Sequence, residues 1–136
     1  VYSPLLRKEG LKPSVVEYKI RRIVNEYIVS PKSEKKLQVA LWWIERLKKD
    51  LELLKADDYH ELMKALEVHA ILDCAEMCAR ASLERKESRW GLHHYRVDYP
   101  ERDDKNWLKF VIIKKDPQTG KMKVETRPVE LKWKFK

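Results

Sequence analysis

Four side chains with metal-binding chemistry form two pairs near the middle of the chain. Cys74 and Cys78 are four residues apart, and so are His69 and Asp73. A structural zinc site takes four ligands, usually drawn from two separate segments, and a Cys-x-x-x-Cys pair supplies half of that set. Free cysteine is also among the residues most often buried in protein cores. We therefore predict two small core residues on a crowded helix, and no metal site.

The two cysteines also bear on the redox setting. Side chains four apart on a helix have Cβ atoms about 5–6 Å apart, whereas a disulfide needs about 3.5–4.5 Å. Cys74 and Cys78 are therefore expected to stay reduced, which favours a cytoplasmic location.

A second group of reactive side chains follows in one segment. His93 and His94 stand beside Tyr95, a combination that could transfer protons, but one loop without a substrate scaffold does not make a pocket. No strand-turn-helix signature presents a serine nucleophile. We expect no catalytic, cofactor-binding or metal residues here, and interpret the segment as an ion-pair network of arginines with acids: Glu87, Arg89, Arg96, Asp98, Glu101, Arg102, Asp103 and Asp104.

Composition sets the class of protein. The chain has 136 residues, 43% hydrophobic and 38% charged, with only three glycines, which argues against phosphate-cradling loops. Its net charge of +8 suggests an anionic partner, either nucleic acid or an acidic protein face. Basic residues alternate with acids along the helices, as on a solvated surface, and outweigh them only in the tail. No apolar run approaches the ~20 residues of a membrane span, so no membrane insertion is expected.

The elements that would position these residues are mainly helices. Residues 1–13 are interpreted as an irregular N-terminal arm, and Ser14 with Glu17 as a capping box that opens a first helix ending at Pro31. Ser33 is expected to cap a second amphipathic helix that reaches Leu54. Its neighbouring Trp42 and Trp43 cannot share one apolar stripe.

A third helix is predicted from Asp58, which caps with Glu61, to about Arg85. Small residues on several faces indicate the central helix of the bundle. Its expected apolar face comprises Leu62, Met63, Leu66, Ala70, Cys74, Met77, Cys78 and Ala81.

Residues 88–106 lack a helical period and are rich in rings and charges, which is typical of an ordered loop. Residues 107–114 and 121–127 have strand chemistry around a turn at 116–120, and residues 129–136 alternate as an extended, apolar-sided tail. The predicted fold is mainly α: a three-helix antiparallel bundle over residues 14–87, similar to a spectrin repeat, followed by an ordered loop and a small β-hairpin tail over 107–136.

The loop also carries a family resemblance. It resembles the closing motif of flavoprotein subunits in the succinate dehydrogenase, fumarate reductase and adenylylsulfate reductase family. The matching residues are Glu87-Ser88-Arg89, Gly91, His94-Tyr95-Arg96, Asp98-Tyr99-Pro100-Glu101-Arg102-Asp103-Asp104 and Asn106-Trp107. The likeness extends over about residues 14–113, since the family's motif also follows three helices.

This resemblance implies a role as the C-terminal helical domain of an FAD-dependent oxidoreductase, which is not catalytic alone. FAD would belong to the full-length protein and not to this fragment. Upstream FAD-binding and capping domains of the same chain are the implied partners, with an iron-sulfur subunit as a further one that takes electrons from the flavin. The start at Val1 fits an excised domain. The implied interface comprises Glu87, Arg89, His93, His94, Tyr95, Arg96, Asp98, Arg102, Asp103 and Trp107.

One departure from the motif concerns the branch of the family. The common form runs Glu-Ser-Arg-Gly-Ala-His, whereas this chain is about two residues longer and has Trp90 and a doubled histidine. This favours an adenylylsulfate-reductase-like or uncharacterised branch, without assigning a substrate. A small basic helical nucleic-acid-binding module and a free-standing adaptor acting through Trp42, Trp43 and the tail are the alternatives.

Overall fold

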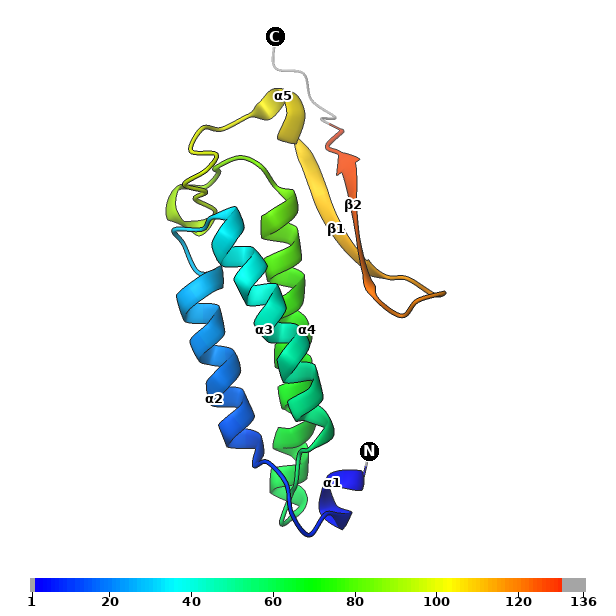
Figure 1. The fold of residues 1–136 in the computed structure, drawn as a ribbon. Helices are drawn as coiled ribbons and strands as arrows, with labels where there is room; N and C mark the ends of the chain where they lie inside the picture. Colours follow the sequence, from blue (N-terminus) through cyan, green and yellow to red (C-terminus); the bar gives the residue numbers. More distant parts are fainter. Residues whose placement is uncertain (1, 131–136) are drawn as a thin grey trace.

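Three long helices lie side by side, and a β-hairpin runs along one of them (Figure 1). The computed structural model describes residues 2–130. In chain order the helices are α1 (Ser3–Leu6), α2 (Pro13–Ile23), the π-helical turn η1 (Val24–Ile28), α3 (Glu34–Glu52), α4 (Tyr59–Glu84), the 3-10 turn η2 (Gly91–His93) and α5 (Asp104–Trp107). The strands are β1 (Lys109–Lys115) and β2 (Met122–Pro128). Helix α1 interrupts the arm that was expected to be irregular.

The start of α2 differs from its prediction. Pro13 is the first helical residue and Lys12 precedes it without a side-chain cap, while the carboxylate of Glu17 accepts a hydrogen bond from Arg21 Nε at 2.7 Å. The predicted capping box at Ser14 is therefore wrong. Proline suits the first helical position because its missing N–H would have no helical partner there and its φ is already helical.

The starts of α3 and α4 are confirmed. Ser33 Oγ accepts from the backbone N–H of Lys36 at 3.3 Å, and Asp58 Oδ1 accepts from that of Glu61 at 2.8 Å. These bonds satisfy backbone donors that have no partner inside the helix. Helix α3 ends at Glu52, so the prediction of a helical Leu54 is wrong. Leu54 instead forms a parallel bridge with Leu11, which ties the N-terminal segment to the α3–α4 connection.

Helix α4 is the central helix, as expected, since it contacts α1, α2, η1, α3 and both strands. Its core face was predicted wrongly. Met63 and Leu66 are exposed, as are Cys74 and Cys78, and the buried apolar positions are Leu62, Ala65, Val68, Leu72, Ala75 and Ala79. Small side chains let neighbouring helices approach closely, and periodicity cannot choose between two apolar faces. The core also includes Val16 and Ile20 of α2 with Ala40, Ile44 and Leu47 of α3.

The hairpin is confirmed with a shifted start. Trp107 ends α5, and β1 begins at Lys109, antiparallel to β2 with Lys109 opposite Pro128 and Lys115 opposite Met122. In the turn, Asp116 accepts hydrogen bonds from the backbone of Gln118 and the hydroxyl of Thr119. The predicted apolar tail continues to residues 131–136, which lie outside the described residues.

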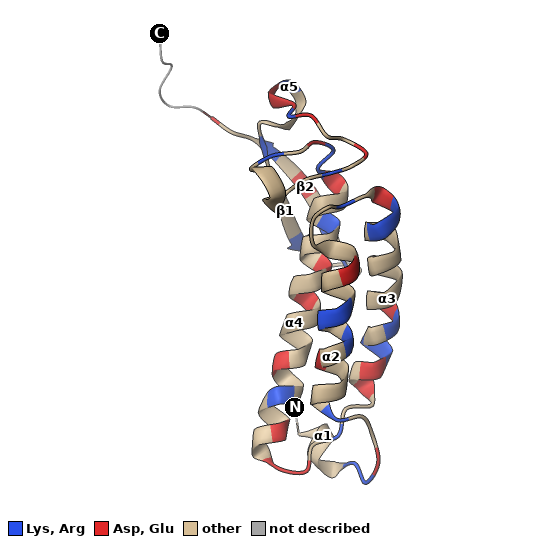
Figure 2. Ribbon diagram, turned by 90° about the vertical axis from the view of Figure 1, so that its left-hand side faces the viewer, with Lys and Arg blue, Asp and Glu red and all other residues tan. Residues whose placement is uncertain are grey.

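Charges of both signs are spread over the helices, as Figure 2 shows.

The predicted mainly helical fold with a C-terminal hairpin is confirmed. Within residues 2–130, the helices lack the combination of length and apolar character that crossing a bilayer requires.

Candidate domain interface

The ordered loop of residues 88–106 closes one end of the bundle. Its backbone pairs with the connection between η1 and α3, where Lys32 N–H donates to Tyr95 O and Val97 N–H donates to Lys32 O, each at 2.9 Å. The hydroxyl of Ser88 accepts from the backbone N–H of Arg96 at 2.8 Å. Backbone and side-chain hydrogen bonds therefore hold the loop in one conformation, which agrees with the prediction of an ordered loop.

A buried carboxylate lies at the centre of this end. Glu87 is 0% exposed and accepts hydrogen bonds from Arg85, from Arg89 (2.7 and 3.0 Å) and from the backbone N–H of Asp103 (2.9 Å). Burial alone would raise the pKa of Glu87, but the bonds from Arg89, the Asp103 backbone and Arg85 outweigh it and lower that pKa. Arg89 also binds Asp104 at 2.6 Å. Part of the predicted ion-pair network thus forms around this acid: Glu87, Arg89, Asp104 and Arg102 are linked, whereas Arg96 pairs separately with Asp98.

Arg96 connects the ends of two helices. Its side chain is 0% exposed and donates to the carbonyls of Ser82 (2.6 Å) and Arg85 (3.3 Å) at the C-terminal end of α4. It also donates to both carboxylate oxygens of Asp98 (2.8 and 2.7 Å), and Asp98 in turn accepts from the backbone N–H of Glu34 at the start of α3 (2.8 Å). The cation and the carboxylate each meet the helix end whose dipole they complement. The bond from Arg96 lowers the pKa of Asp98 to about 2.

The two histidines are in different surroundings. His94 is 8% exposed, with Nε2 at 3.4 Å from the carbonyl oxygen of Arg85, whereas His93 is exposed. Burial, together with the nearby charge of Lys32, lowers the pKa of His94. His94 therefore packs inside the loop, whereas its neighbour His93 faces solvent.

The tip of the loop points outward. Trp90 and Gly91 both have left-handed backbone conformations, with φ of 57° and 59°, which turn the chain sharply between the paired Arg89 and His94. This turn leaves Trp90 69% and Leu92 79% exposed. A bulky residue with positive φ is uncommon and persists only where its surroundings hold it. Here the paired guanidinium of Arg89 lies 6.0 Å from the Trp90 ring centroid.

An open apolar groove of about 700 Å³ begins beside this tip. Its lining comprises Val24, Ile28, Val29, Ser30, Lys32, Ile71, Cys74, Ala75, Cys78, Leu92 and His93. The two cysteines are therefore at a surface groove, and their prediction as core residues is wrong. They gain no further metal ligands, because no group of three or more suitable side chains occurs within residues 2–130.

The groove continues along α4 as an exposed stripe, here called the α4 stripe, made of Met63, Leu66, Ala70, Cys74, Met77 and Cys78. Met63 is 53%, Leu66 45% and Met77 37% exposed. Glu67 is a charged residue on the same face. Exposed apolar residues that cluster in this way mark an interaction site more often than single exposed residues do. Six of the eight residues predicted as the core face of α4 thus form one outer face, whereas Leu62 is buried as predicted and Ala81 is partly buried.

The structure divides the ten predicted interface residues into three groups. Glu87, His94 and Arg96 are buried inside this chain; Arg89, Tyr95, Asp103 and Trp107 are partly buried; His93, Asp98 and Arg102 are exposed. The network brings most of them together, so their first effect is to hold the loop in shape. Sequence reasoning did not identify Leu92 or the α4 stripe as surface. The sequence feature that could have indicated the α4 stripe is the presence of two apolar faces on one helix, since only one of them can face α2 and α3.

The comparisons with known proteins agree with this architecture. A family described as "Fumarate reductase flavoprotein C-term" matches residues 17–136. The adenylylsulfate reductase structure from Archaeoglobus fulgidus is similar over 98% of this chain and 24% of its own, with 34% identity and a TM-score of 0.90. The alpha subunit of adenylylsulfate reductase from Megalodesulfovibrio gigas is 28% identical over 130 residues, which cover 92% of this chain and 20% of the relative. The succinate dehydrogenase flavoprotein subunit of Rickettsia conorii is 38% identical over 71 residues, 52% of this chain and 11% of the relative.

The chain therefore belongs to the family of fumarate reductase flavoprotein C-terminal domains. It spans about a fifth or less of the length of these curated relatives. The expected resemblance is confirmed, and the nucleic-acid-binding alternative is not favoured.

The residues described do not fit a dinucleotide cofactor by themselves. A dinucleotide site needs glycines in a turn between a strand and a helix. Gly10 packs against Leu53 and Lys55, and the other two glycines lie in the loop tip and the hairpin turn.

Proposed function

We propose that this chain is the C-terminal helical domain of the flavoprotein subunit of an FAD-dependent oxidoreductase, and that it braces an upstream FAD-binding domain. The observation that carries the proposal is the family match over residues 17–136. The full-length protein would hold FAD and carry out the redox chemistry in the cytoplasm, with a capping domain over the substrate. The relatives are named as subunits, which supports a partner subunit, for which an iron-sulfur protein is the proposed candidate.

The interface is proposed to comprise two parts. The exposed and partly buried members of the predicted set would contact the neighbouring domain directly, together with Trp90 and Leu92. The α4 stripe and its groove would extend this contact along the helix, since they supply apolar area that a domain boundary can bury. The buried Glu87, His94 and Arg96 would act by fixing the position of the loop.

Sequence identity among the similar solved structures supports the adenylylsulfate-reductase-like branch for the substrate. The Archaeoglobus fulgidus structure is 34% identical over 98% of the chain, whereas the Mycobacterium smegmatis Sdh1 structure is 21% identical over 99%. The longer loop tip with Trp90 points the same way. Turnover of adenylylsulfate, and not of succinate or fumarate, by the full-length enzyme is the expected result.

The docking proposal is tested by binding to the upstream FAD-binding part, expressed separately. We expect Leu66→Arg in the α4 stripe to weaken co-purification strongly, because a charge then replaces an apolar contact. Val39→Arg is the matched control, since Val39 is 40% exposed on α3. Equal binding by the two variants would contradict the interface, and a tightly held, stoichiometric flavin in the isolated chain would contradict the division of roles.

A further inference from the structure

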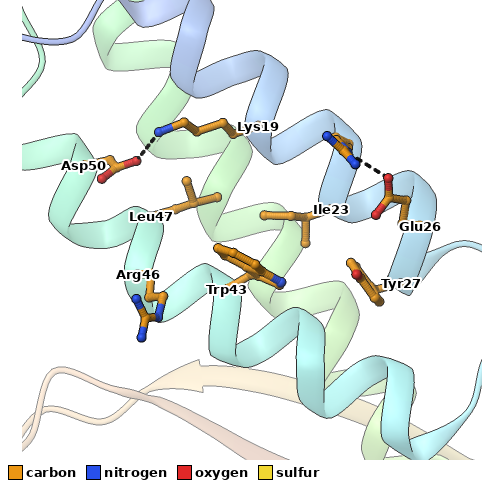
Figure 3. Close-up of a pocket in the computed structure, with 9 residues that line it drawn as sticks. Lys19, Ile23, Glu26, Tyr27, Trp43, Arg46, Leu47 and Asp50 are labelled. Carbon is orange, nitrogen blue, oxygen red and sulfur yellow. Dashed lines mark hydrogen bonds and ion pairs between the residues drawn. The ribbon is translucent and has the colours of Figure 1, made fainter.

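A second surface groove lies between α2 and α3, away from the α4 stripe. Figure 3 views it with α4 behind it, and its open volume is about 490 Å³. The floor is apolar, made by Ile23 of α2 and Leu47 of α3, which are 8% and 3% exposed. Tyr27 and Trp43 form the walls from opposite helices. The groove is therefore built by two helices and not by a loop.

Trp43 and Arg46 line the groove from α3, and both contact Trp42, which lies outside the lining. Trp42 and Trp43 are 50% and 40% exposed and make an edge-to-face pair with centroids 4.8 Å apart. The Arg46 guanidinium lies 4.0 Å from the Trp42 ring centroid. Tryptophan, tyrosine and arginine are the residues that contribute most binding energy at protein interfaces. Two adjacent exposed tryptophans on an amphipathic helix have no role in the core described above.

The charges of the groove favour an acidic occupant. Lys19 is paired with Asp50 across the groove at 2.8 Å, and Arg22 of α2 with Glu26 of η1 at 2.8 Å. Arg46 makes no ion pair with a carboxylate in the part of the chain that the structure describes. Three cations thus face two carboxylates, and the whole chain carries +8. A guanidinium already fixed on a ring is preorganised to bind a carboxylate through two parallel hydrogen bonds.

We propose that the α2–α3 groove binds an extended segment of a partner protein, in which a carboxylate stands next to an aromatic or long aliphatic side chain. The apolar side chain would lie on Ile23 and Leu47 between Trp43 and Tyr27. The carboxylate would pair with Arg46. This inference goes beyond the proposed function, because the groove is lined by residues of α2, η1 and α3 and by none of the α4 stripe.

The charges also select against other occupants. A second copy of this chain would bring another +8 towards a cationic groove, which opposes association. Nucleic acid would place phosphates beside Asp50 and Glu26, and binders of that kind concentrate their basic residues on one face. A peptide with few charges can instead place its carboxylate at Arg46 alone.

The test is selection from a phage-displayed library of random peptides against the 136-residue chain. We expect enriched peptides that combine Asp or Glu with Trp, Phe or Leu. Binding of an enriched peptide, measured by fluorescence anisotropy, should weaken more than about tenfold in Arg46→Gln, since a bond to a charged group is lost. Trp43→Ala should weaken it at least as much.

Matched variants separate this site from other exposed residues. Arg21→Gln on α2 and Trp90→Ala on the loop tip should leave peptide affinity unchanged, and thermal unfolding should show that all four variants are folded. No enrichment of acidic peptides, or equal affinity for wild type and Arg46→Gln, overturns the proposal. So does tighter binding of a single-stranded oligonucleotide than of the peptide, or a dimer that Trp43→Ala dissociates. None of these results depends on a flavin domain, so they leave the proposed function standing.

Discussion

Replacing Glu87 with glutamine should destabilise the fold far more than removing an exposed charge from the same network. The carboxylate is 0% exposed and accepts four hydrogen bonds, three of them from arginines. In Glu87→Gln the side chain keeps its shape but loses its charge, so Arg85 and Arg89 stay in place without their counter-charge. Their side chains are only 11% and 9% exposed, so water compensates poorly.

The size of the effect follows from that burial. Removing one partner of a buried ion pair costs about 3–5 kcal/mol, and an amide oxygen that still accepts weaker bonds recovers part of it. We therefore expect a loss of about 3 kcal/mol in the free energy of unfolding, or about 10 °C in Tm for a chain of this size. Asp104→Asn is the matched control. Asp104 is 50% exposed, so solvent screens its ion pairs with Arg89 and Arg102 and their loss should change stability little.

Urea and thermal unfolding, both followed by circular dichroism, measure the difference. The loss in Glu87→Gln should persist at high salt, because buried pairs are screened little, whereas any loss in Asp104→Asn should shrink. Equal effects of the two substitutions would refute the reasoning, as would a loss below about 1 kcal/mol in Glu87→Gln.

Three further outcomes are expected. The pKa of Asp98 is about 2 in the folded chain, below its ordinary value of 3.8. The stability that the ionised Asp98 adds to the fold is therefore present above pH 4 and is lost as pH falls towards 2. Asp98→Asn should flatten that part of a curve of unfolding free energy against pH. The pKa of His94 is lowered from 6.5 in the folded chain. As pH drops below about 6.5, His94 is protonated more readily in the unfolded chain than in the folded one, so the free energy of unfolding decreases. His94→Gln should remove this pH dependence in urea unfolding titrations. Gly10→Ala should cost about 1–3 kcal/mol in thermal unfolding, because its Cβ would stand 2.4 Å from the carbonyl oxygen of Leu53, and wild-type stability would contradict this packing.

Features that depend on neighbours in the chain were predicted well. Ser33 and Asp58 were identified as helix caps because a short polar side chain three residues before a free backbone N–H can reach it directly. The hairpin followed from alternation on both sides of a turn containing Asp116 and Gly120. The aromatic rings and charges of residues 88–106 predicted an ordered loop. They did not predict which acid would lie at the centre of its ion pairs.

Features that depend on distant partners were predicted less well. Pro13 and Ser14 both suit the start of a helix, and the observed packing of the N-terminal segment on Leu53 and Lys55 accompanies the earlier start. Trp107 has strand chemistry but ends α5, where Asp103 accepts from Asn106 and where the carbonyl of Trp107 accepts from Arg85.

The sequence by itself determined the three long helices, the hairpin, the ordered loop and the family resemblance, because caps, periodicity and motif spacing act over a few residues. Only the tertiary structure decided which face of α4 is buried, and it moved Cys74 and Cys78 from the expected core to a groove. It also showed that Trp43 and Tyr27 form opposite walls of the α2–α3 groove. The physical reason is that burial depends on which helices approach. Helix α4 offers two apolar faces, and α2 and α3 pack on the face of Leu62, Ala65, Val68, Leu72, Ala75 and Ala79, so the α4 stripe is left outside.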